Sequence, residues 1–223
     1  MERHFDEEVK HINEKLIRMA AIVEEMIRIA IKSLIDRNNS VLAFINPKEK
    51  EVNDLQIIID EEIITLIARM QPVATDLRFL IAASKINSEL ERIADQVINI
   101  GQNTLILVKY PQLKPLVDIP LMADVVQQMV HDSLDSYIHK DVDTAQKVLS
   151  SDDKVDAFKD QIFRELLTYM MSEPQTIQRA LCFILIARNL ERIGDHSTNI
   201  AEEVIYMVQG RDVRHHHEEQ KRK

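Results

Sequence analysis

Residues 90–100 read LERIADQVINI, and residues 190–200 read LERIGDHSTNI. The two stretches stand one hundred residues apart and are identical at seven of their eleven positions. In both, apolar residues recur at the three- and four-residue spacing of an amphipathic α-helix. Self-similarity at a fixed distance indicates an internal repeat, so the sequence predicts two similar helical halves.

The helix that contains each copy of the repeat can be followed outward in both directions. Around the first copy, the apolar stripe predicts a helix from Pro72 to about Val108. Around the second copy, it predicts a helix from Pro174 to Gln209, and Gly210 follows as a C-terminal stop. Because a proline precedes the same motif in both halves, the duplication extends beyond the motif itself.

Shorter and longer helices are expected to alternate in the rest of each half. Ser40 caps a short segment, and Pro47 opens the longer helix that follows, because proline is tolerated in a first helical turn. In the second half, the polar residues 150–153 separate a short helix from a longer one. The expected ranges of these helices are 4–36, 41–46, 47–71, 121–139, 142–149 and 154–171.

Three prolines fall within residues 110–120, which is typical of a connection between two structural units. The predicted fold class is all-α, a tandem repeat of two three-helix bundles. Its expected organisation is a first bundle at 1–110, a linker at 111–120, a second bundle at 121–210 and a charged tail at 211–223. His215 to His217 in this tail could chelate a metal ion, although tail residues without such a role are the simpler interpretation.

Composition excludes several classes of function. Three Gly in 223 residues leave little for hairpin turns or phosphate-binding loops, and the net charge of −9 argues against a nucleic-acid partner. The longest apolar run, Ala180 to Ala187, is far shorter than the roughly 20 residues of a membrane span, and the single Cys182 forms no internal disulfide. We therefore expect a cytoplasmic protein without a direct membrane span.

The repeated motif places two carboxylates on one helix face in each half. Glu91 and Asp95 are four residues apart, as are Glu191 and Asp195, so each pair lies one helical turn apart. Like charges so placed repel by about 0.3 kcal/mol, so a helix shaped only by its own stability would avoid them. Such pairs are frequent in an acidic chain, and the informative feature is their recurrence in matching helices.

A second pair of oxygen-bearing side chains is expected opposite each of these. The repeat register pairs Glu49 and Asn53 of the first half with Asp152 and Asp156 of the second. If neighbouring helices pack antiparallel, four such side chains converge in each half. Several carboxylates at close quarters stay ionised only when cations neutralise them, and oxygen ligands without thiolate suit Mg²⁺, Mn²⁺, Ca²⁺ or iron.

A simpler alternative weighs about as much on spacing alone: a solvated acidic face with Arg92 and Arg192 as partners. Asn99 and Asn199 could add oxygen donors or make hydrogen bonds between helices. His196 has Gln96 at the matching position, which argues against a ligand role for it. The Glu-x-x-His motif of ferritin-like di-iron sites is absent from the two repeats, and no Walker loop, nucleophile elbow or His–carboxylate base was found. We expect a binding protein with no catalytic residues.

The sequence resembles the PhoU family of regulators of bacterial phosphate uptake. The resemblance lies in QPVATDLR at 71–78 and in LERIAD and LERIGD at the start of the repeats, and it extends over roughly residues 4 to 215. It implies two similar three-helix bundles in which E(D)xxxD motifs on two helices of each bundle hold multinuclear metal clusters. The implied ligands are Glu49, Asn53, Glu91 and Asp95 in the first site, and Asp152, Asp156, Glu191 and Asp195 in the second.

The resemblance leaves the metal open, with Mn, Mg, Fe and Zn as candidates. Asn53 departs from the family pattern because it supplies a neutral oxygen in place of a carboxylate. The first site should therefore bind metal more weakly, or hold fewer ions, than the second.

The resemblance also implies a function and partners. It implies a cytoplasmic homodimeric adaptor, peripheral at the inner membrane through its partners, that represses the phosphate-starvation response and modulates high-affinity phosphate uptake. The partners would be the ATPase component of the phosphate transporter and a phosphate-sensing membrane histidine kinase. Two alternatives stay open: a metal-dependent hydrolase or oxidase that uses the carboxylate clusters, and a metal-free helical scaffold.

Overall fold

The computed structural model describes residues 2–211 and residue 213. Over these residues the chain forms six long α-helices and one 3₁₀ turn, with no β-strand. The elements are α1 Glu2–Ile35, α2 Val41–Met70, α3 Ala74–Val108, α4 Asp118–His139, α5 Val142–Ser172, η1 Pro174–Thr176 and α6 Ile177–Gln209. None of the helices in this part of the chain is long and apolar enough to cross a membrane.

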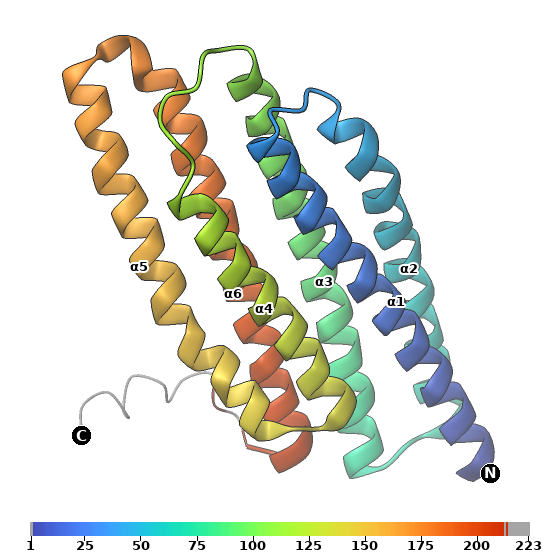
Figure 1. The fold of residues 1–223 in the computed structure, drawn as a ribbon. Helices are drawn as coiled ribbons and strands as arrows, with labels where there is room; N and C mark the ends of the chain where they lie inside the picture. Colours follow the sequence, from blue (N-terminus) through green and yellow to red (C-terminus); the bar gives the residue numbers. More distant parts are fainter. Residues whose placement is uncertain (1, 212, 214–223) are drawn as a thin grey trace, which may run out of the picture.

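The helices form two layers (Figure 1). One layer has the order α2, α3, α6, α5, and its two central helices, α3 and α6, run antiparallel side by side. The other layer consists of α1, which packs on α2 and α3, and α4, which packs on α5 and α6. The first three helices thus make one group, the last three make another, and α3 and α6 join the two.

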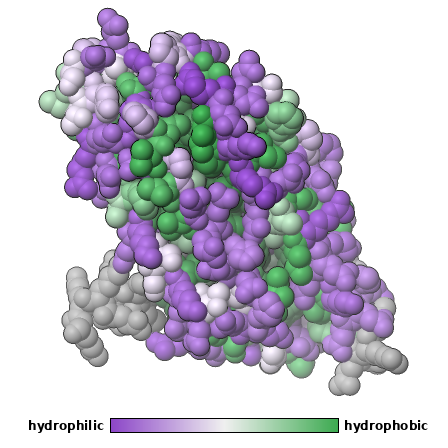
Figure 2. Space-filling model, viewed as in Figure 1, coloured by the Kyte–Doolittle hydropathy of each residue, from purple (hydrophilic) through white to green (hydrophobic). Residues whose placement is uncertain are grey.

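The core follows the apolar stripes that the sequence predicts. Leu90 and Ile93 on α3 and Leu190 and Ile193 on α6 are fully buried. Each such side chain contributes about 1.5–3 kcal/mol relative to an exposed one, so the apolar residues of the two repeated motifs help to form the core. The face shown in Figure 2 is mostly hydrophilic, with hydrophobic side chains gathered in its upper centre and in smaller strips elsewhere.

The predicted breaks at Pro47 and at residues 150–153 are wrong, because α2 and α5 are each continuous. In α2, the buried side chains of Val41, Ile45 and Val52 continue one apolar stripe across Pro47. A proline inside a helix costs about 3 kcal/mol through one lost hydrogen bond and a steric clash, and this burial offsets the cost. Ser40 precedes α2, but its side chain makes no capping hydrogen bond.

In α5, the serines of the expected break are accommodated in the helix. Ser150 and Ser151 donate their hydroxyl hydrogen bonds to the carbonyls of Gln146 and Lys147, one turn earlier, at 3.0 and 2.9 Å. This bonding pattern allows a hydroxyl side chain to remain inside a helix. The true start of α5 is marked by Asp141, whose side chain accepts hydrogen bonds from two backbone N–H groups of the first turn.

The segment between α3 and α4 spans residues 109–117, and α4 begins at Asp118, before the boundary expected at 121. Pro120 therefore lies in the first turn of α4, where its missing N–H leaves no helical hydrogen bond unmade. Lys114 anchors the segment: its side chain is only 4% exposed and forms ion pairs with Asp118 and with Glu165 of α5.

The ends of the two central helices largely follow the sequence predictions. α3 starts at Ala74, two residues after Pro72, and ends at Val108 as expected. Pro174 opens a 3₁₀ turn, and α6 follows at Ile177. Gly210 ends α6 in the left-handed conformation, with φ of 65°, which glycine adopts without strain. His215 to His217 lie outside the described residues.

Candidate functional site

The first acidic cluster consists of Glu49 and Asn53 on α2 and Glu91 and Asp95 on α3. Its geometry is set by the antiparallel packing of these two helices. Asn87 donates a hydrogen bond to the carbonyl of Gln56 at 2.9 Å, and Ser84 donates to Asp60 at 3.2 Å. With this register, position 53 faces position 91 and position 49 faces position 95.

The carboxylates of the first acidic cluster influence one another electrostatically. Burial raises the pKa of Glu91 above its ordinary value, and the negative charges of Asp95 and Glu49 raise it further. Burial and the charge of Glu49 likewise raise the pKa of Asp95. The two motif residues on α3 and the carboxylate of Glu49 on α2 therefore repel one another.

Asn53 has an unusual bonding state within the first acidic cluster. Its Nδ2 donates a hydrogen bond to Glu49 Oε1 at 2.7 Å, while its Oδ1 is buried and has no hydrogen-bond partner. A buried carbonyl oxygen without a donor is costly unless something else satisfies it. An oxygen in this state, beside three carboxylates, fits a hard divalent cation.

The second acidic cluster consists of Asp152 and Asp156 on α5 and Glu191 and Asp195 on α6. Burial raises the pKa of Asp152, and the charges of Asp156 and Glu191 add to the shift. Burial, then Glu191 and Asp152, raise the pKa of Asp195 to about 6. All four predicted side chains of the second half therefore interact electrostatically, and all four offer oxygen donors.

Lys159 also belongs to the second acidic cluster, although the spacing of the acidic motifs does not predict it. Its Nζ donates to Asp156 Oδ1 at 2.7 Å and to Glu191 Oε1 at 3.0 Å, so it bridges α5 and α6. Hydrogen bonding to Asp156 raises the pKa of Lys159, and the bond to Glu191 adds to this effect. In the repeat register, Lys159 stands opposite Gln56 of the first half. This difference between the halves is the sequence signal that marks Lys159.

The side chains as they stand do not yet form a ligand cage. Within residues 2–211 and 213, no group of three or more His, Cys, Asp or Glu side chains is arranged to hold a metal ion. In the second acidic cluster, two of the four carboxylates, those of Asp156 and Glu191, already form ion pairs with Lys159. The helices thus bring each set of four predicted residues together, but cation binding would require their side chains to rearrange.

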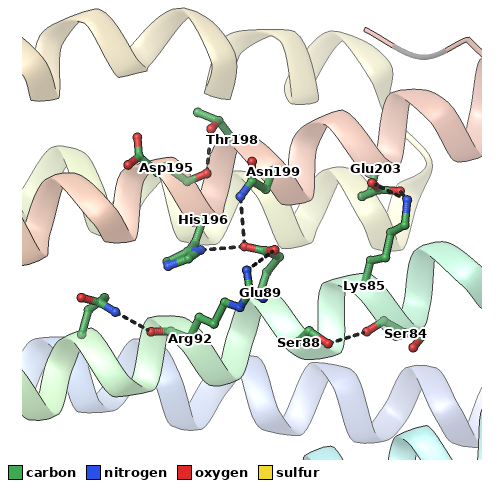
Figure 3. A network of polar contacts seen from close by, with 11 residues as sticks. Ser84, Lys85, Ser88, Glu89, Arg92, Asp195, His196, Thr198, Asn199 and Glu203 are labelled. Atoms are coloured by element: carbon green, nitrogen blue, oxygen red, sulfur yellow. Dashed lines mark hydrogen bonds and ion pairs between the residues drawn. The ribbon is translucent and has the colours of Figure 1, made fainter. Parts of the chain in front are cut away.

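His196 and Asn199 face away from the second acidic cluster. Figure 3 shows Asp195 on one side of α6 and both of these residues on the other, directed toward Glu89 of α3. His196 Nδ1 donates to Glu89 Oε2 at 2.6 Å, and Asn199 Nδ2 donates to the same oxygen at 3.1 Å. The interpretation of Asn199 as a helix-to-helix hydrogen-bond donor is therefore confirmed.

Glu89 is the centre of this polar network, which the sequence analysis did not identify. Burial alone would raise the pKa of Glu89, but the hydrogen bonds from His196 and Asn199 hold it below its ordinary value. Arg92 lies 3.6 Å from Glu89, its ion-pair partner one turn away. Lys85 extends the same interface through Glu203 of α6, at 2.8 Å (Figure 3).

Comparisons with known proteins agree over most of the chain. The family model of the PhoU domain matches residues 16–104 and 119–204. A phosphate-specific transport system accessory protein PhoU homolog from Aquifex aeolicus is 38% identical over 214 residues, which cover 96% of this chain and 97% of that protein. One from Pseudomonas putida is 36% identical over 214 residues, covering 96% and 84% of the two chains. The crystal structure of PhoU from Pseudomonas aeruginosa gives a TM-score of 0.90 at 36% identity, covering 93% of this chain and 100% of that one.

Proposed function

Because this chain belongs to the PhoU domain family, we propose that it serves as an accessory protein of phosphate-specific transport. The observation that carries this proposal is the similarity to proteins of that name over most of both chains. The relatives are named as accessory proteins and not as enzymes, which favours a regulatory role over a catalytic one.

The finer proposal is that the protein acts in the cytoplasm as a homodimeric adaptor. It would contact the ATPase component of the phosphate transporter and a phosphate-sensing membrane histidine kinase. Through these contacts it would repress the phosphate-starvation genes when phosphate is sufficient and restrain uptake. Its long helices present extended faces to solvent, which suits a protein that works by contact with others (Figure 1).

The two acidic clusters would bind divalent or iron-type cations, with Mn, Mg, Fe and Zn as candidates. Three features support this. Carboxylates from separate helices lie together in both halves, and burial followed by the negative charge of neighbouring carboxylates raises the pKa of Glu91 and of Asp195. In addition, Asn53 Oδ1 is buried without a hydrogen-bond partner. A bound cation would supply the positive charge that neutralises each cluster and would tie neighbouring helices together.

Deletion of the gene in its host tests the regulatory role. The expected result is constitutive expression of phosphate-scavenging enzymes in phosphate-rich medium, measured as alkaline phosphatase activity. Restoring the wild-type gene should return expression to the repressed level. Normal repression in the deletion strain would contradict the proposed role.

The enzyme alternative is tested on the purified, metal-loaded protein. We expect no turnover of phosphoesters and no consumption of dioxygen. The metal-depleted control carries Glu91→Gln and Asp95→Asn in the first acidic cluster together with Glu191→Gln and Asp195→Asn in the second. Turnover that the wild type shows and this variant lacks would replace the adaptor proposal with the enzyme alternative. Elemental analysis of protein purified without chelator separates both from the metal-free scaffold, since only a scaffold would carry no metal.

A further inference from the structure

The two acidic clusters reach the same formal charge by different means. The first has three carboxylates and the amide of Asn53, whereas the second has four carboxylates and the ammonium of Lys159. The repeat register pairs Asn53 with Asp156, and one turn later it pairs Gln56 with Lys159. The second half thus gains one acid and one base relative to the first.

The added base lies where a bridging cation would have to act. Lys159 Nζ is 2.7 Å from Asp156 Oδ1 on its own helix and 3.0 Å from Glu191 Oε1 on α6. It therefore links the two helices through two of the four candidate ligands. The Lys159 side chain is 31% exposed, so water does not fully screen these contacts.

We propose that Lys159 is an internal counter-ion of the second acidic cluster, one that a metal ion must displace in order to bind. The proposal rests on the proposed metal binding and deepens it. In the metal-free protein, the ammonium neutralises part of the repulsion among the four carboxylates. When a divalent cation enters, Asp156 and Glu191 exchange Lys159 for the ion.

The surroundings of Lys159 allow this exchange. A groove of about 330 Å³ between α5 and α6 adjoins the cluster and is lined by Lys159, Phe163, Arg188 and Glu191, among others. The long, flexible lysine side chain can move into this groove without any change in the backbone. The exchange lowers the affinity for metal, because the ion must first break two charge-assisted hydrogen bonds.

The test measures Mn²⁺ binding to the second acidic cluster alone. Full-length protein carrying Glu91→Gln and Asp95→Asn in the first acidic cluster is freed of metal with chelator and equilibrated by dialysis against a series of Mn²⁺ concentrations. Bound manganese is measured by plasma mass spectrometry. Lys159→Gln, which installs the residue type of Gln56, is compared with Lys147→Gln, a matched loss of charge at an exposed position of the same helix.

We expect Lys159→Gln to lower the Kd for Mn²⁺ at least tenfold and Lys147→Gln to change it less than twofold. Without metal, Lys159→Gln should also have a lower melting temperature, and Mn²⁺ should raise that temperature by more than it does in the parent. Lys159→Arg keeps the positive charge and the fold, and it should bind Mn²⁺ no more tightly than the parent.

Three results would overturn the proposal. Equal or weaker Mn²⁺ binding by Lys159→Gln refutes the role of Lys159 but leaves the metal site standing. Tighter Mn²⁺ binding by Lys159→Arg than by the protein with only Glu91→Gln and Asp95→Asn also refutes the role of Lys159. This comparison tests that role even if Lys159→Gln fails to fold. Absence of Mn²⁺ binding by the parent and by every variant refutes the metal site itself.

Discussion

Asn53 illustrates how a single residue sets the expected strength of a site. Its neutral oxygen stands where the second acidic cluster has the carboxylate of Asp156, so the first acidic cluster offers a cation three carboxylate ligands and not four. Asn53→Asp should therefore tighten Mn²⁺ binding at the first acidic cluster by at least severalfold. It should also lower the melting temperature of the metal-free protein, because it adds a fourth repelling charge.

Equilibrium dialysis in a background with Glu191→Gln and Asp195→Asn measures the first acidic cluster by itself. Asn39→Asp, in the exposed turn between α1 and α2, adds the same charge at a distance and should leave Mn²⁺ binding unchanged. Unaltered affinity in Asn53→Asp would mean that Asn53 does not contact the ion.

Asp195 gives the metal-free protein a predictable response to pH. Its pKa is raised to about 6 in the folded protein, mainly by burial and then by Glu191 and Asp152. A carboxyl group with a raised pKa holds its proton more tightly in the folded than in the unfolded state. The folded protein therefore loses stability as the pH rises from about 4 through about 6. In chelator, the melting temperature should fall less from pH 5 to pH 7 in Asp195→Asn than in the wild type.

Asp124→Asn, an exposed change on α4, is the control for this comparison and should follow the wild-type pH dependence. The wild type and Asp195→Asn would show the same fall if Asp195 titrated as a free carboxyl group. Saturating Mn²⁺ should reduce the fall in the wild type, because the ion replaces the proton.

At the residue scale, the sequence predicted the candidate ligands but not the charges beside them. Spacing and repetition are enough to place Glu91 with Asp95 and Glu191 with Asp195, because one helical turn separates them in any helix. Lys159 and Glu89 escaped notice for a different reason. A lone charged residue on an amphipathic helix is usually solvated, and only the packing of a second helix shows what it contacts.

At the scale of the elements, α2 shows where local signals mislead. Pro47 was expected to start a helix, yet the helix begins at Val41 and passes through it. The burial of Val41 and Ile45 against the rest of the first group outweighs the local preference of proline, which no single-residue rule can weigh. The repeat itself was a stronger signal, since it depends on many residues at once.

The cost of Pro47 can be measured. Pro47→Ala restores an N–H that can donate to the carbonyl one turn earlier, so it should raise the free energy of unfolding by up to about 3 kcal/mol. Pro120→Ala, in the first turn of α4, should change that free energy by a much smaller amount, because an N–H there has no helical partner. Urea denaturation followed by circular dichroism measures both, and a destabilised Pro47→Ala would contradict this account of α2.

The interface between α3 and α6 depends on Glu89. Its carboxylate is 14% exposed and accepts hydrogen bonds from His196 and Asn199 of the other half. Glu89→Ala leaves the buried His196 and the partly buried Asn199 without their acceptor, so it should lower the free energy of unfolding by about 1–3 kcal/mol. Glu61→Ala, at an exposed position of α2, is the control and should lie within about 0.5 kcal/mol of the wild type. Equal stability of the two variants would show that the network contributes nothing.

At the scale of the whole molecule, the duplication explains the arrangement of the two candidate sites. One acidic cluster lies between α2 and α3 and the other between α5 and α6, on either side of the α3–α6 interface (Figure 1). The sequence predicted the six helices of the two halves from their repeat. It could not predict that α3 and α6 meet, because the side chains that join them, such as Lys85 and Glu203, have no counterparts in the repeat.

We propose that both acidic clusters hold metal ions, and anomalous diffraction would locate such ions. Crystals of the full chain grown with Mn²⁺ would be measured on both sides of the manganese absorption edge. We predict anomalous peaks among Glu49, Asn53, Glu91 and Asp95, and among Asp152, Asp156, Glu191 and Asp195, with the stronger peak at the second set. Ordered carboxylates at both places with no anomalous peak between them would contradict the claim.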